Sequence, residues 1–186
     1  MFTLREPSTG DLAQLVREQA TGGVLSYPEV GATAGSLPPG FRHDRWRADL
    51  GADEGDRFDR AAEALRHWRP QRGAGLRIFP DEPVAADATF ALVVRVGLAV
   101  ATAAGRVVYV VDEPNRFGFA YGTLTAHPEQ GEESFAVVRD RGRVGFEIVA
   151  FSRPRHPLAR LGAPVTRRMQ LRVTQRYLGA MRDAAA

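Results

Sequence analysis

The sequence contains no cysteine and no lysine. Without cysteine the chain can form no disulfide, thiolate nucleophile, iron–sulfur cluster or cysteine-ligated zinc site. Nothing indicates an oxidising compartment, so we expect a cytoplasmic protein. Long hydrophobic runs are also missing, because Arg95 and several glycines interrupt the longest apolar stretch. The N-terminus lacks a basic region followed by an apolar run, so we expect neither a signal peptide nor a membrane span.

Arginine carries all of the side-chain positive charge apart from histidine. The formal net charge is only +3, yet the pI is 9.9 because arginine titrates at very high pH. Together with the scarcity of isoleucine, this composition is typical of a GC-rich genome and is weak evidence for a nucleic-acid partner. With 44% hydrophobic and 25% charged residues among 186, the composition is that of a globular protein. We predict one domain over residues 1–186.

Several common catalytic and nucleotide-binding motifs are absent. The sequence has no GxGxxG, Walker A, GxSxG or HExxH pattern, which disfavours the mechanisms that depend on them. The four histidines lie far apart and never at the spacing of metal ligands; they are His43, His67, His127 and His156. We therefore predict no metal site and no cofactor.

Two short helices are expected in the first part of the chain. Residues 8–20 begin with residues suited to N-capping, Ser8 and Thr9, and place apolar side chains on one face. Residues 56–68 carry apolar side chains at helical spacing, with charged residues on the other faces, and Pro70 should end this helix. Residues 27–41 are rich in proline and glycine, which predicts an ordered but irregular loop.

From residue 88 onward the apolar residues recur with a period of two. Alternation along residues 88–101 predicts a first strand. Further strands are expected at residues 106–112, 117–125, 132–139 and 144–151. The connections are short and rich in turn residues, one of them at residues 103–105. Short connections favour antiparallel hairpins, because a parallel pair needs a crossover of about a dozen residues or more.

The last element is a long amphipathic helix, predicted at residues 161–182. Its apolar stripe repeats every four residues and consists of Val165, Met169, Val173 and Tyr177. An arginine ridge runs beside the stripe and consists of Arg168, Arg172 and Arg176. The order of elements predicts an α+β fold in which an antiparallel meander grips the C-terminal helix, the helix-grip plan of START and Bet v 1-like (SRPBCC) proteins.

Several blocks of the sequence also resemble a known family. They are YPEVGAT at 27–33, RVVYVVDE at 106–113, FAYGTLTAHPEQGEESF at 119–135, AFSRP at 150–154 and RRMQLRVTQRYL at 167–178. In this order, and over nearly the whole chain, they are similar to the uncharacterised family DUF1990, also called UPF0548. The resemblance implies a relative but no activity.

The strand at residues 117–123 has one large and one small face. Its aromatic and threonine side chains alternate with glycine and alanine, so a neighbouring segment can approach the small face closely. The large face is either an ordinary aromatic core, which we favour, or the wall of a ligand cavity. A buried Tyr121 hydroxyl needs a partner, and the strand that starts at Glu132 can supply one.

The turn after this strand places a histidine near several carboxylates. If Glu133 shares the inward face with Phe135, it is a carboxylate in an apolar cavity with a raised pKa suited to proton transfer. Alternation could equally turn Glu132 inward. The candidate catalytic residues are Tyr121, His127 and Glu133.

Two function classes follow. We prefer a carrier or sensor that binds a small hydrophobic molecule between sheet and helix, since nothing in the sequence demands chemistry. The alternative is a cyclase- or hydrolase-like enzyme with a buried Tyr121/Glu133 acid–base pair. The candidate ligand-binding residues are Tyr27, Phe119, Tyr121, Thr123, Phe135, Arg153, Met169 and Tyr177.

Arginines also suggest two further roles. Arg153 could clamp a ligand carboxylate or phosphate, although we favour pairing with Glu147 or capping of the strand end as the role of this single arginine. Residues 153–182 contain eight arginines and no acid, a surface that could meet nucleic acid or an anionic membrane. We disfavour that reading because docking on the sheet explains the regular stripe.

Overall fold

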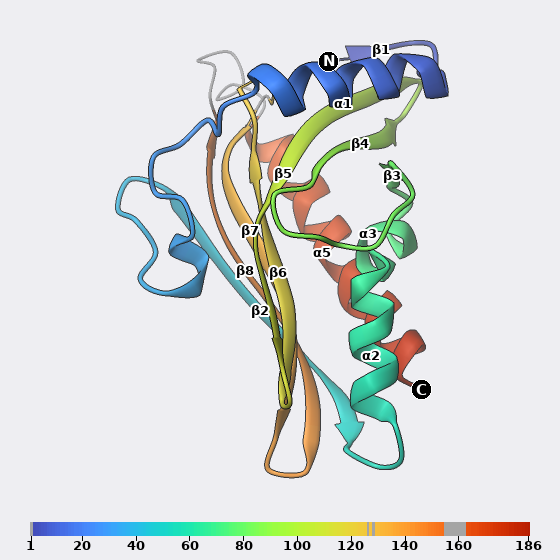
Figure 1. Cartoon of the computed structure of the whole chain (residues 1–186), viewed down its shortest axis with the longest axis vertical. Coiled ribbons are helices and arrows are strands. Elements are labelled where there is room, and N and C mark those ends of the chain that lie inside the picture. The colour runs from blue at the N-terminus through green and yellow to red at the C-terminus, as the bar shows by residue number, and fades with distance from the viewer. Residues whose placement is uncertain (1, 126, 128, 155–162) are drawn as a thin grey trace.

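The computed structural model describes residues 2–125, 127, 129–154 and 163–186 (Figure 1). The elements in chain order are β1 (Phe2–Thr3), α1 (Thr9–Gly22), the 3₁₀ turn η1 (Ala32–Ala34), β2 (Arg42–Ala52), α2 (Arg57–Arg66), α3 (Arg69–Gly73), β3 (Arg77–Phe79), β4 (Thr89–Val96), β5 (Ala99–Glu113), β6 (Arg116–Thr123), β7 (Glu129–Asp140), β8 (Arg143–Pro154) and α5 (Ala163–Ala185). In this part of the chain, no helix combines the length and hydrophobicity needed to cross a membrane.

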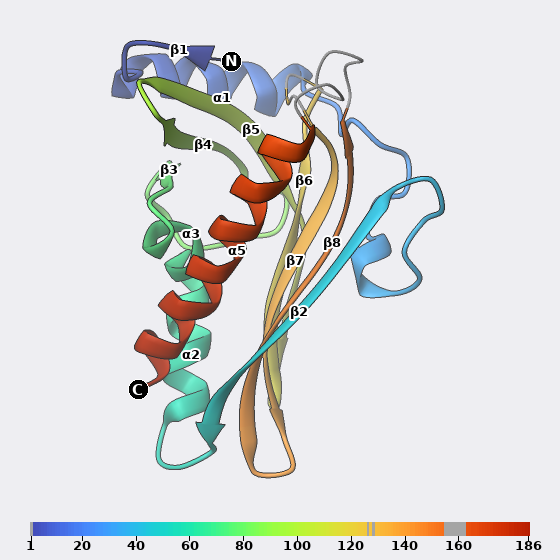
Figure 2. The same ribbon diagram turned by 180° about the vertical axis from the view of Figure 1, so that it is seen from behind.

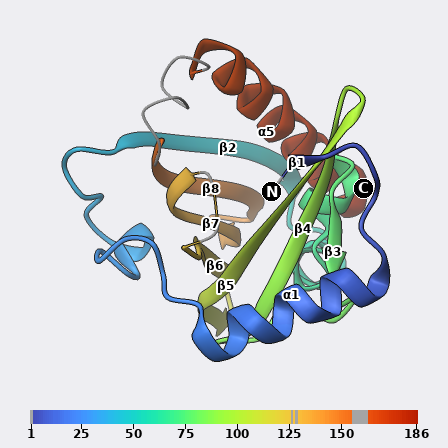
Figure 3. The ribbon, with the colours of Figure 1, turned by 90° about the horizontal axis from the view of Figure 1, so that it is seen from above.

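The strands form one antiparallel sheet in the order β2-β8-β7-β6-β5-β4-β3, and β1 pairs with β5. The sheet is strongly curved, and α2, α3 and α5 occupy its concave side (Figures 2 and 3). The helix α5 crosses the sheet obliquely. The predicted fold class, an antiparallel meander gripping a long C-terminal helix with two shorter helices before the meander, is confirmed.

The core fills the space between the concave face and the helices. Directly opposed residues of an antiparallel sheet point to the same face, so cross-strand rows of side chains line this space. One row joins Phe119, Phe135, Ile148 and Trp46 on β6, β7, β8 and β2. The helix α5 covers the rows with the buried side chains of its second half: Tyr177, Leu178, Ala180, Met181 and Ala185. This half of α5 is therefore part of the core.

The helix α1 packs on the outer face of the sheet. Its N-cap is Ser8, whose side chain accepts from the backbone of Asp11, while the Asp11 side chain accepts from the backbone of Ser8. Its buried residue Leu12 contacts Ala91, Val93 and Val100 on β4 and β5. A second, smaller core thus lies outside the curve of the sheet.

Three details of the strand prediction were wrong. The expected strand at 88–101 is two strands, because the chain turns at Gly97, where φ is +61° and favours glycine. Residues 103–105 lie inside β5 and form no turn. A Cβ on Gly105 would lie 2.8 Å from the ring of Phe90, so this glycine accommodates a ring. The short strands β1 and β3 were not predicted.

The edge strand β2 was also missed. Its sequence, RHDRWRADLGA, is highly charged, and only Trp46, Ala48 and Leu50 place apolar side chains inward. Charged residues on an edge strand discourage pairing with other chains. The hydrophobic alternation was therefore too weak to indicate a strand.

The second predicted helix, at residues 56–68, ends slightly early, and a short helix that was not predicted follows it. The helix α2 ends at Arg66, Trp68 takes a left-handed conformation with φ +59°, and α3 starts again with Pro70 in its first turn. Pro70 thus begins a helix, because the first turn needs no backbone N–H from proline. Trp68 is 2% exposed, and its ring lies 4.7 Å from Phe90 and 4.9 Å from Phe119.

The arginine ridge lies on the exposed side of α5. One of its side chains has a contact with the fold, since Arg176 donates to the Ala74 carbonyl at 3.4 Å. Changing Arg168, Arg172 and Arg176 together to glutamine should therefore cost no more than about 1.5 kcal/mol, since exposed substitutions cost about 0.5 kcal/mol each at most. Urea unfolding checks this value. A loss of several kcal/mol would mean that the ridge is internal.

Candidate functional site

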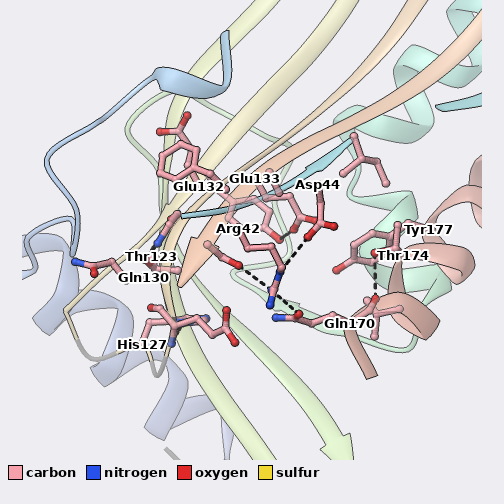
Figure 4. Close-up of a pocket in the computed structure, with 18 of the residues that line it drawn as sticks. Arg42, Asp44, Thr123, His127, Gln130, Glu132, Glu133, Gln170, Thr174 and Tyr177 are labelled. Carbon is pink, nitrogen blue, oxygen red and sulfur yellow. Dashed lines mark hydrogen bonds and ion pairs between the residues drawn. The ribbon is translucent and has the colours of Figure 1, made fainter. Parts of the chain in front are cut away.

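A cavity of about 230 Å³ lies between the concave face of the sheet and the first half of α5 (Figure 4). Its apolar wall consists of Trp46, Leu92, Ile148, Met169 and Val173. Its polar lining includes Arg42, Asp44, Tyr121, Thr123, His127, Glu133, Arg167, Gln170 and Tyr177. The cavity is therefore an apolar space with polar groups contributed by both the sheet and α5.

One cross-strand row supplies the central polar groups. Tyr121 on β6 opposes Glu133 on β7, Glu133 opposes Ala150 on β8, and Ala150 opposes Asp44 on β2. The four side chains share the concave face, because opposed residues point the same way. Ala150 separates the two carboxylates, and its small side chain leaves room above the sheet.

Tyr121 and Glu133 form a hydrogen-bonded pair. The Tyr121 hydroxyl donates to Glu133 Oε2 at 2.7 Å. Burial raises the pKa of Glu133 to about 7, with the hydrogen bond from Tyr121 opposing this shift and Asp44 adding to it. Burial also raises the pKa of Tyr121, so this hydroxyl keeps its proton. Near neutral pH, Glu133 therefore changes its protonation state inside the cavity.

A network of partly exposed charged side chains lies at the mouth of the cavity. Arg167 donates two hydrogen bonds to Asp44, at 2.8 and 2.6 Å, while Arg42 lies 3.4 Å from the same carboxylate. Burial alone raises the pKa of Asp44, but Arg167 and Arg42 together lower it below its ordinary value. Arg42 Nη2 also donates to Ser152 at 3.0 Å and to Gln170 at 2.7 Å. The network ties α5 to β2 and β8.

His127 lies on the wall of the cavity, apart from Glu133 and Tyr177 (Figure 4). Its Nδ1 accepts a hydrogen bond from the Glu129 backbone at 3.0 Å. Burial lowers the pKa of His127 to about 4, so the ring is neutral at pH 7. The structure thus does not bring this candidate together with Tyr121 and Glu133.

Tyr27 lies on the opposite face of the sheet, outside the cavity. Its hydroxyl donates to Glu132 at 2.7 Å, and the same buried carboxylate accepts from the backbone N–H groups of Gly31 at 2.8 Å and Thr33 at 3.0 Å. Gly122, opposite Glu132 on β6, makes room, since a Cβ there would lie 2.1 Å from the Tyr27 hydroxyl. Glu132 thus anchors the loop at residues 27–33.

Glu132 was only an alternative to Glu133 at the level of sequence, and its role as an anchor was missed. Both carboxylates are used, on opposite faces, because neighbouring residues of a strand alternate. The glycine and alanine face of β6 was the signal that could have revealed this anchor. Another segment was predicted to approach that face closely, and Tyr27 does so at Gly122.

The other predicted ligand-binding residues fall into two groups. Thr123, Met169 and Tyr177 line the cavity, as does Tyr121. Phe119 and Phe135 are fully buried in the adjacent core row. Arg153 is exposed, donates to Gln130 at 2.6 Å and lies 4.2 Å from the ring centre of Phe41. It does not pair with Glu147, whose partners are Arg47 and Arg116. The side chain of Val165 lies outside the described residues.

Sequence reasoning missed several lining residues. Arg42, Asp44 and Trp46 come from β2, which was not predicted, and Arg167 and Gln170 lie beside the apolar stripe of α5. Among the residues that the structure describes, no three histidine or acidic side chains are grouped closely enough to hold a metal ion.

The geometry defines a helix-grip protein with a cavity under its C-terminal helix. The family model described as "Domain of unknown function (DUF1990)" matches residues 26–180, and the chain belongs to this family. A UPF0548 protein of Deinococcus radiodurans is 36% identical over 202 residues, which cover 100% of this chain and 99% of that protein. A UPF0548 protein of Dictyostelium discoideum is 29% identical over 195 residues, which cover 91% of this chain and 89% of that protein.

A solved structure of similar fold is the hypothetical protein jhp0584 of Helicobacter pylori. It has a TM-score of 0.60 at 11% identity, covering 88% of this chain and 96% of that one. The protein TTHA0849 of Thermus thermophilus has a TM-score of 0.54 at 9% identity, covering 77% of this chain and 97% of that one. At such low identity these matches concern the fold alone.

Proposed function

We propose that this protein binds a small, mainly hydrophobic molecule in the cavity between the sheet and α5. The observation that carries the proposal is the cavity itself, which combines an apolar wall with convergent polar groups, as small-molecule sites do. Its volume of about 230 Å³ is below the roughly 300–1,000 Å³ of typical ligand pockets, so the ligand is small. Carriage or sensing needs no more than this arrangement.

Native mass spectrometry of the purified protein tests the proposal. The wild type should carry a small-molecule adduct that denaturation releases. Ala150→Leu puts a larger side chain between Glu133 and Asp44, and this variant should lose the adduct. The control is Val149→Leu, on the opposite face of the same strand, which should keep it. An adduct that survives Ala150→Leu would place the binding site elsewhere.

A second candidate function is acid–base catalysis, favoured by the hydrogen bond of 2.7 Å between Tyr121 and Glu133. The carboxyl group has a pKa raised to about 7 by burial, which suits proton transfer at neutral pH. A cyclase or hydrolase of this kind would use Glu133 as the base or acid and Tyr121 to orient it.

Tyr121→Phe distinguishes the two candidates. The variant should fold, at a cost of about 1 kcal/mol, the usual net value of one hydrogen bond. A carrier should then lose only a little affinity for the molecule identified by mass spectrometry. An enzyme should lose roughly a hundredfold or more in turnover of that molecule. Tyr109→Phe is the matched control, because the Tyr109 hydroxyl bonds Thr33 instead of a cavity residue, and it should change neither property.

A further inference from the structure

Two arginines, Arg42 and Arg167, line the cavity together with several carboxylates. Arg42, Arg167 and Asp44 are partly exposed at its mouth, with side-chain exposures of 36%, 32% and 18%. Asp44 is the carboxylate that pairs with both arginines within the part of the chain that the structure describes. Glu129 also lines the cavity but forms no ion pair with either arginine among the residues described.

Arg42 is the arginine with the weaker carboxylate pairing. Arg167 makes both short hydrogen bonds to Asp44, a bidentate geometry that matches one guanidinium to one carboxylate. Arg42 reaches Asp44 only at 3.4 Å, and its Nη2 bonds the uncharged Ser152 and Gln170. A ligand carboxylate could replace these neutral partners and form a stronger, charge-assisted bond.

The inner part of the cavity suits a different group. Trp46, Ile148 and Val173 form an apolar wall, and the buried Glu133 with its Tyr121 partner lies on the sheet nearby. An ionised Glu133 would repel a ligand anion, so an anionic group binds most favourably at the mouth, beside Arg42. A ligand cation would meet two arginines on entry. The single positive charge of the Arg42 guanidinium also matches a monoanion better than a dianion.

We propose that the ligand is a small monocarboxylic acid, whose carboxylate binds Arg42 at the mouth and whose apolar ring or chain lies against the inner wall. This assignment rests on the proposed function, since it names the chemical class for the same cavity. Gln170 can add a hydrogen bond from its side-chain amide after Arg42 exchanges partners. The carboxylate is then recognised by charge at the mouth, and the apolar part of the ligand by contact with the inner wall.

The test compares three compounds with one apolar body and different head groups: 3-phenylpropionate, 3-phenylpropan-1-ol and 3-phenylpropylammonium. Isothermal titration calorimetry at pH 7.5 gives their affinities for the full chain. The acid should bind about tenfold more tightly than the alcohol, which corresponds to about 1.4 kcal/mol. The ammonium compound should bind more weakly than both.

Variants identify the responsible arginine. Arg42→Gln should abolish the preference, so that the variant binds the acid no more tightly than the alcohol. Arg42→Lys keeps the charge and should keep part of the preference. Arg45→Gln removes an exposed arginine of the same strand and should change nothing. The comparison of the three compounds on the wild type needs no variant, so it remains decisive even if a substitution impairs folding.

Each other result overturns the inference. Equal affinities of the wild type for acid and alcohol, or an acid preference that persists in Arg42→Gln, would remove Arg42 as the recognition group but leave the cavity as a binding site. A preference for ammonium would assign recognition to Glu133. If none of the three compounds binds while native mass spectrometry finds an adduct, the ligand belongs to another class. If neither method detects binding, the proposed function also fails.

Discussion

Ending the chain after Pro164 should leave a protein without a cooperative thermal unfolding transition. The truncation removes three large buried side chains of α5: Tyr177, Leu178 and Met181. Loss of one such side chain costs about 2–5 kcal/mol, so the three together cost about 6–15 kcal/mol. Domains of this size are stable by only about 5–15 kcal/mol in total. Far-UV circular dichroism during heating measures the transition.

Two point substitutions calibrate that result. Met181→Ala should lower the free energy of unfolding by about 2–5 kcal/mol and keep the transition cooperative, because the side chain is fully buried. Arg182→Ala, at the exposed neighbouring position, should change it by no more than about 0.5 kcal/mol. If the truncated chain kept an unchanged, cooperative thermal unfolding transition, α5 would not belong to the core.

Glu133 should make the protein less stable as the pH rises. Burial raises the pKa of Glu133 to about 7 in the folded protein, above its ordinary value of 4.5. Between these values the folded state binds more protons than the unfolded state, so the free energy of unfolding falls as pH increases. The stabilisation from Glu133 amounts to roughly 3 kcal/mol. It is complete below about pH 4.5 and is lost progressively as the pH rises to about 7.

The variant Glu133→Gln isolates this effect, because glutamine does not titrate. Subtracting the urea-unfolding free energy of the variant from that of the wild type should give a difference that decreases by roughly 3 kcal/mol from pH 4.5 to pH 8. His127 acts in the opposite direction: burial lowers its pKa to about 4, so its stabilisation is lost as the pH falls from about 6.5 to about 4. His127 is common to both proteins and cancels in the difference. A difference that stays flat across this range would mean that Glu133 is solvated.

The local patterns that predicted the fold are strong where one face of an element is uniformly apolar. Two such cases are α5, with an apolar residue at every fourth position, and β6, with alternating large and small side chains. Each pattern results from burying one face of the element. The same logic placed a large face and a bare face on β6, and Gly122 is indeed where Tyr27 approaches. The strand β2 escaped prediction because its outward residues are charged and its inward ones are few.

Local alternation also establishes that Glu132 and Glu133 point to opposite faces, but it cannot say what either face meets. That is decided by contacts distant in sequence: Thr33 bonds Glu132 across 99 positions, and Arg167 bonds Asp44 across 123. The register of four strands sets Glu133 two strands from Asp44, and the path of α5 sets Gln170 beside Arg42. The sequence by itself thus predicted α1, α2, α5 and most of the strand meander with their buried faces, through periodicity. Only the tertiary structure decided which carboxylate anchors a loop and which faces the cavity, because that depends on the segments packed against each face.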